Sequence, residues 1–89
     1  MKVINLTLDA AMAYLSSHAR HYQSDAKPLF AIGIENEDKK LCGAVVIGEN
    51  AGDAQLSHIY SAGEYQGYTL LYGAAWRAAK ALGYERMIM

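Results

Sequence analysis

His58 and Tyr60 are the residues whose types and spacing best suit acid–base chemistry, since both lie in the short segment QLSHIYS. A histidine titrates near neutral pH, so His58 can take a proton from an amine or polarise a water molecule. The Tyr60 hydroxyl can act as the acid. The alternative for His58 is a strand histidine with an ordinary hydrogen bond. That alternative is the commoner case, and the sequence shows no partner residue that would favour a catalytic role for His58.

Two other sets of reactive residues are better explained by structure than by chemistry. His18 and His21 lie three residues apart, a spacing that can bring two side chains together on a helix. A metal site would need further ligands, and the only candidates are Asp25 and Glu35. We therefore interpret the two histidines as part of a polar helix face. Cys42 lies inside a strand pattern, which favours a buried thiol over an exposed nucleophile.

Length and charge limit the kind of protein. The 89 residues fit one domain, 1–89. The net charge of −1 and eight scattered basic residues argue against nucleic-acid binding. The N-terminus has no signal-type apolar run, and no stretch approaches the roughly 20 apolar residues of a membrane span, so no membrane association is expected. A single cysteine excludes an intrachain disulfide, and we expect a cytoplasmic protein.

The apolar spacing predicts two helices. The first spans 8–22, with Thr7 or Asp9 as its cap. Its predicted apolar stripe consists of Leu8, Met12, Leu15, Ala19 and Tyr22. The second spans 69–82 and ends at Gly83. Its predicted inner face consists of Leu70, Leu71, Ala74, Ala75, Ala78 and Leu82.

Alternating and β-branched segments predict five strands, at 2–6, 29–35, 41–48, 55–61 and 84–89. The short charged link 36–39 favours an antiparallel hairpin, whereas 49–53 and 62–68 are predicted loops. Apolar residues on both faces of 29–35 indicate a sheet covered on both sides. The predicted fold is an α/β or α+β sandwich with a mixed sheet in the order β-α-β-β-β-α-β, ending in a parallel crossover.

The middle and C-terminal segments together resemble a known family. LFAIGIENEDKKLCGAVVIGEN followed by QLSHIYS is similar to the middle strands of the Gcn5-related N-acetyltransferases. The segment 64–67 resembles the start of that family's pyrophosphate loop, and LLYGAAWRAAKALGYERMIM resembles the helix and strand that follow it. The resemblance covers roughly residues 27–89. It is strongest to short acetyltransferase-like proteins of bacteria and phages.

This resemblance implies an acetyl-CoA site where the fourth strand meets the next helix. In the family, that strand splays from its neighbour, so its amides pair with the pantetheine arm and stabilise the oxyanion. The helix N-terminus presents N–H groups to the pyrophosphate. The residues implied along the pantetheine are Ile59, Tyr60 and Ser61. Those implied around the phosphates are Gly63, Gln66, Gly67, Tyr68 and Thr69.

The sequence also departs from the family pattern. The second and third glycines of the pyrophosphate loop are missing. No Lys or Arg lies between Gln55 and Ala75, and Glu64 would repel a phosphate. No carboxylate lies between Ala54 and Ser61 to serve as a base. The chain is expected to be truncated after the fifth strand, so that a dimer partner completes the site or catalysis has been lost.

Two functions therefore stay open. The first is an N-acyltransferase that transfers acetyl from acetyl-CoA to an amine acceptor. The second is a non-catalytic module of the same fold that binds a protein, for example as a phage-type inhibitor. Tyr60, Tyr65, Tyr68 and Tyr72 could serve either, as ligand contacts or as an interface. Both functions predict a homodimer, because the sheet is expected to end at Met89 and to leave an edge there, and an exposed edge pairs readily with another chain.

Overall fold

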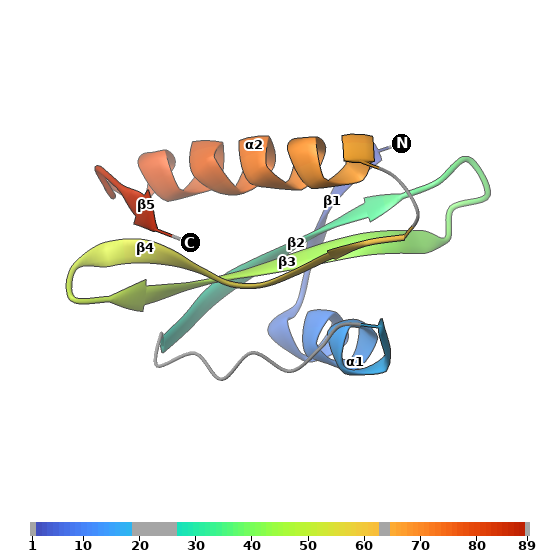
Figure 1. Cartoon of the computed structure of the whole chain (residues 1–89), viewed down its shortest axis with the longest axis horizontal. Coiled ribbons are helices and arrows are strands. Elements are labelled where there is room, and N and C mark those ends of the chain that lie inside the picture. The colour runs from blue at the N-terminus through green and yellow to red at the C-terminus, as the bar shows by residue number, and fades with distance from the viewer. Residues whose placement is uncertain (1, 19–26, 63–64, 89) are drawn as a thin grey trace.

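The computed structural model describes residues 2–18, 27–62 and 65–88, which form a five-stranded sheet with a helix on each face (Figure 1). The predicted element order β-α-β-β-β-α-β is the observed order, and the fold is α+β. The strands are β1 (Lys2–Leu6), β2 (Lys27–Glu35), β3 (Leu41–Asn50), β4 (Asp53–Ser61) and β5 (Met87–Ile88). The helices are α1 (Leu8–His18) and α2 (Tyr65–Ala81).

The sheet is mixed, and its strands lie in chain order. Strands β1 to β4 pair antiparallel, whereas β4 and β5 pair in parallel, as the predicted crossover requires. The β3–β4 loop is shorter than the predicted 49–53, because Ala51 and Gly52 alone make the turn. Both have positive φ angles, 54° and 86°, which suit a two-residue hairpin.

Two apolar cores lie on the two faces of the sheet. Side chains alternate along β2 and β3, so Ile34 and Val45 point to α2 whereas Ala31 and Val46 point to α1. On the α2 side, Leu71 and the alanines of α2 pack closely against the sheet. Each fully buried Leu, Ile or Val contributes about 1.5–3 kcal/mol to folding. The sheet is therefore the common layer that joins both helices.

The predicted helix stripe of α1 is corrected in one position. Thr7 caps the helix, since its Oγ1 accepts a hydrogen bond from the Ala10 N–H at 3.1 Å. Ala11 and Leu15 face the sheet, whereas Met12 is 43% exposed. The small side chain of Ala11 lets α1 approach the sheet closely, which turns Met12 outward. The predicted residues Ala19 and Tyr22 lie outside the described part of the chain.

The start of α2 is also corrected. The helix begins at Tyr65, four residues before the predicted Thr69, so the glycine-containing segment is largely helical. Its end follows the prediction: Gly83 has a φ of 101°, and the N–H of Tyr84 bonds to the Ala79 carbonyl. Leu82 lies past the helix and is 62% exposed, contrary to its predicted inward position. Among the described residues, neither helix combines the length and the apolar character needed to cross a membrane.

Candidate functional site

The end of β4 and the start of α2 lie in direct contact because Gly67 has no side chain. Gly67 is buried in the first turn of α2. A Cβ atom there would overlap the Oγ of Ser61 and would lie 2.9 Å from Ser61 Cβ and 3.1 Å from Ile34 Cδ1. The first turn of α2 therefore rests on the last residue of β4.

This first turn carries the residues that the resemblance implied for the phosphates. Gln66, Gly67, Tyr68 and Thr69 all lie in α2, whereas Gly63 lies outside the described residues. The amides of residues 65–68 are the first four of the helix, so they have no acceptor within it. No acidic residue occupies the first turn, and Thr69 is exposed. Together with the helix dipole, this geometry favours an anion.

The outer edge of β4 is open beside this turn. β4 pairs with β3 along its length but with β5 only at Ala54 and Gln55, within the described residues. The Ala62 N–H bonds to the Cys42 carbonyl at 2.9 Å. In an antiparallel pair, residues that bond to the neighbouring strand alternate with residues whose backbone groups point away from it, so this bond shows which residues of β4 bond to β3. The N–H and C=O of Ile59 therefore point away from β3, toward an edge that no described strand covers. They are available to an extended ligand.

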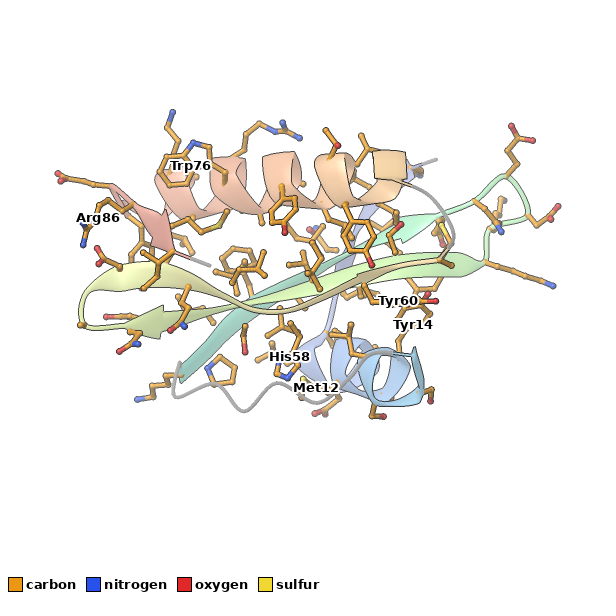
Figure 2. All side chains as sticks on the ribbon, in the orientation of Figure 1. Met12, Tyr14, His58, Tyr60, Trp76 and Arg86 are labelled. Carbon is orange, nitrogen blue, oxygen red and sulfur yellow. The ribbon has the colours of Figure 1, made fainter. Side chains whose placement is uncertain are left out.

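A β-bulge at Ser57 divides the side chains of β4 between the two faces. The pairing with β3 shifts between His58 and Leu56. After this shift Ile59 faces the α2 side with Leu56, whereas His58 and Tyr60 face α1 (Figure 2). The proposed proton-transfer residues therefore lie across the sheet from the first turn of α2. The sequence does not mark the bulge with a glycine or proline.

His58 has a local partner that the sequence did not single out. The Oγ of Ser57 lies 2.9 Å from the Nδ1 of His58, and Ser57 is itself buried. When Nδ1 donates to Ser57, the lone pair of Nε2 is the one available to accept a proton. His58 is half-buried on the α1 side. This geometry orients the ring for proton transfer, and it equally satisfies an ordinary strand histidine.

Tyr60 lies beside Tyr14, which sequence reasoning missed. The two ring centroids are 6.0 Å apart and tilted by 54°, a favourable aromatic geometry. Burial, together with the nearby Tyr60, Cys42 and Tyr68, raises the pKa of Tyr14. Its hydroxyl therefore stays protonated at neutral pH. No sequence signal links these residues, because the contact joins α1 to β4.

An open groove of about 790 Å³ lies between α2 and the segment 85–88. Its lining residues include Tyr72 and Trp76 on the α2 side and Met87 and Ile88 on the other. The predicted tyrosine group is thus divided, because Tyr60 faces α1 whereas Tyr72 lines this groove. The side chain of Tyr65 lies outside the described part.

The remaining candidates show no reactive geometry. Cys42 is half-buried, and its thiol donates to the Ile34 carbonyl at 3.5 Å. His21 and the side chain of His18 lie outside the described residues. Within the part of the chain that the structure describes, no three His, Cys, Asp or Glu residues gather as metal ligands would.

No protein-family model matches the sequence, and neither a curated protein nor a solved structure matches the chain significantly. The candidate site therefore has to be judged on its own geometry.

Proposed function

We propose that this domain is a Gcn5-related acetyltransferase that binds acetyl-CoA where β4 meets α2 and transfers the acetyl group to an amine. One observation carries the proposal: the amides of the first turn of α2, which have no acceptor within the helix, lie at the end of β4, beside the open edge of that strand. A phosphate group and an extended arm could then bind side by side. The sequence resemblance and the parallel pairing of β4 with β5 support the same conclusion.

The chain offers backbone groups rather than cations for the carrier. The amides of residues 65–68 would hold the pyrophosphate, with the exposed Thr69 hydroxyl beside them. The N–H and C=O of Ile59 would bond to the pantetheine arm. No Lys or Arg lies between Gln55 and Ala75 to add charge pairing, so the helix dipole is the main attraction. When bound, acetyl-CoA supplies a thioester that an amine can attack.

Proton transfer would take place on the α1 side of the sheet. Nε2 of His58 would accept the proton of the amine, and Ser57 would hold the ring through Nδ1. The Tyr60 hydroxyl would donate a proton to the leaving thiolate. On this proposal the carrier lies along the open edge of β4, and the amine reaches it from the face that α1 covers in part.

Thermal unfolding with and without acetyl-CoA tests this proposal. A ligand at 100 times its Kd raises the free energy of unfolding by about 2.7 kcal/mol, which shifts the Tm of a domain this size by several degrees. Thr69→Glu should weaken acetyl-CoA binding about tenfold through repulsion of the phosphates. Thr69→Gln, which is similar in size but neutral, should bind nearly as the parent chain does.

Position 69 suits this test better than Gly67, because a side chain at Gly67 would disturb the packing on Ser61. Equal binding by the Glu and Gln variants would place the phosphates elsewhere. The absence of any shift at millimolar acetyl-CoA would contradict the proposal as a whole.

The separation of His58 and Tyr60 from the first turn of α2 favours a second candidate, a non-catalytic binding module. Such a module would bind acetyl-CoA or a protein without transferring the acetyl group. An assay of acetyl transfer to a panel of primary amines distinguishes the two. Transfer that is lost in His58→Gln, with acetyl-CoA binding retained, supports the enzyme.

A further inference from the structure

The groove between α2 and the segment 85–88 has the form of a small-molecule site. Its volume of about 790 Å³ lies in the range of ligand pockets, and most of its lining is apolar. Tyr72 and Trp76 are one helical turn apart, so their side chains lie next to each other along the groove. Gly73 also lines the groove, and the flexible end of Arg77 covers its side-chain position. The opposite wall is formed by Met87 and Ile88.

The absence of a side chain at Gly73 leaves space that only the flexible end of Arg77 enters. A Cβ atom there would meet only the Arg77 guanidinium, with Nη1 at 3.2 Å. Tyr72 and Trp76 line the same groove as Gly73. Aromatic rings pair favourably with other rings in stacked or tilted arrangements. The shape and the chemistry of the groove therefore suit a planar aromatic ring.

Positive charge gathers at the rim of this apolar groove. The Arg77 guanidinium lies over Gly73, and the Lys80 Nζ lies 5.5 Å from the centroid of the Trp76 ring. In the described part of the chain, no carboxylate lies within ion-pair distance of Arg77 or Lys80. Arg86, also at the groove, is paired with Asp53 at 2.6 Å. Glu85 is the one acid that lines the groove among the described residues.

We propose that this groove binds a ligand in which a planar aromatic ring is joined to an anionic group. The flexible end of Arg77 moves off Gly73 to pair, together with Lys80, with the carboxylate, sulfonate or phosphate of the ligand. The ring then lies against Gly73 beside Tyr72 and Trp76. This inference does not depend on acetyl transfer, although Thr69 of the proposed phosphate site also lines the groove. Two sources share the chemistry: a free aromatic acid, and the adenine–phosphate end of a nucleotide.

Trp76 provides a direct readout because it is the only tryptophan of the chain. The probe is 8-anilinonaphthalene-1-sulfonate, a planar aromatic anion, titrated into the full chain while Trp76 fluorescence is followed. Quenching of Trp76 together with a rise in probe fluorescence is the expected result. N-phenyl-1-naphthylamine, which has similar rings but no sulfonate, should bind about tenfold more weakly.

Two variants test the geometry. Gly73→Leu fills the space for the ring, and it should weaken probe binding about tenfold or more without lowering the Tm, since leucine favours a helix more than glycine does. Arg77→Gln removes one cation of the rim and should weaken binding about threefold to tenfold. The matched controls are Lys39→Gln, a cation removed from the distant β2–β3 turn, and Leu82→Ser, an apolar residue removed from the opposite side of α2. Neither control should change probe binding.

Competition then assigns the source. Displacement of the probe by adenosine diphosphate identifies a nucleotide, and displacement by indole-3-acetate identifies a free aromatic acid. The proposal is overturned if neither compound displaces the probe, if the neutral analogue binds as tightly, or if Gly73→Leu binds like the parent chain.

Discussion

Gly67 fixes how closely α2 approaches β4, and its replacement by alanine tests this. A methyl group at position 67 would overlap the Ser61 hydroxyl and crowd Ile34. Helix propensity alone would favour alanine, but overpacking at a buried site costs about 1–3 kcal/mol. We therefore expect Gly67→Ala to lower the free energy of unfolding by about 1–3 kcal/mol, measured by urea denaturation.

Gly73 on the same helix provides the matched control. Its side-chain position is open except for the flexible end of Arg77, so Gly73→Ala should stabilise the domain by about 0.5–1 kcal/mol. Ser61→Ala should restore part of the stability lost in Gly67→Ala, because it removes the overlapping hydroxyl. Equal stability of the two glycine variants would show that close packing does not depend on Gly67.

Single residues of the site show where sequence reasoning stops. The types of His58 and Tyr60 are readable from the sequence, and strand alternation gives them a shared face. Which face of the sheet this is could not be predicted, because it depends on the unmarked bulge at Ser57. The proximity of Tyr14 to Tyr60 was also hidden, because it follows from how α1 packs on the sheet. The catalytic and cofactor roles of these residues stay predictions.

The attachment of the short strand β5 to the sheet depends on side-chain contacts as much as on its backbone hydrogen bonds to β4. β5 pairs with β4 at only two positions. The preceding segment is tied to the β3–β4 hairpin by Tyr84, whose hydroxyl donates to Glu49 at 2.6 Å, and by the Arg86–Asp53 ion pair. Hydrogen bonding to Arg86 lowers the pKa of Asp53, and hydrogen bonding to Glu49 raises the pKa of Tyr84.

The direction of these shifts predicts how pH acts on β5. The pKa of Asp53 is lowered in the folded chain, so its contribution is present above the unfolded value of 3.8 and is lost as the pH falls through the folded pKa. The Ala54 N–H bonds to the Arg86 carbonyl and reports on this attachment. We expect its hydrogen-exchange protection factor to fall between pH 6 and pH 3 by roughly a few-fold.

Asp53→Asn removes the titrating group, so Ala54 should show the lower protection at both pH values. The Ala62 amide, bonded to Cys42 on the other side of β4, is the internal control and should keep its protection. Ala54 protection that changes with pH to the same extent in Asp53→Asn would show that other groups hold β5.

Most of the elements could be predicted, because alternation and β-branched residues define the strands, and Gly83 defines the end of α2. The start of α2 could not, since Gly67 was interpreted as part of a loop, whereas it is a contact point inside the helix. The predicted inward position of Met12 is wrong because spacing fixes a helical stripe only to within one neighbouring residue, whereas that of Leu82 is wrong because α2 ends at Ala81. In α1 the helix lies closest to the sheet at Ala11, so the face that contains Ala11 is buried and the face that contains Met12 is not.

At the scale of the whole molecule, the sheet is wider than the one helix that covers its α2 face. Two grooves flank α2, one beside β5 and a second of about 530 Å³ beside β1 and β2. Phe30 and Leu82 are among the apolar residues that line the second groove. Leu82 and the β1 residue Val3 are both partly open to solvent, at 62% and 38%. This combination of a bare groove and an outer strand edge resembles surfaces that other chains cover.

The homodimer expected from the sequence should therefore involve the β1 side of the molecule. Multi-angle light scattering of the full chain should show a dimer at high protein concentration. Leu82→Ser should raise the dissociation constant about tenfold or more, since burying a leucine side chain is worth about 1.5–3 kcal/mol. Met12→Ser removes a comparably exposed apolar residue from α1, on the opposite face, and should leave the dimer unchanged. A monomeric parent chain would contradict the dimer, and a stronger effect of Met12→Ser would move the interface to α1.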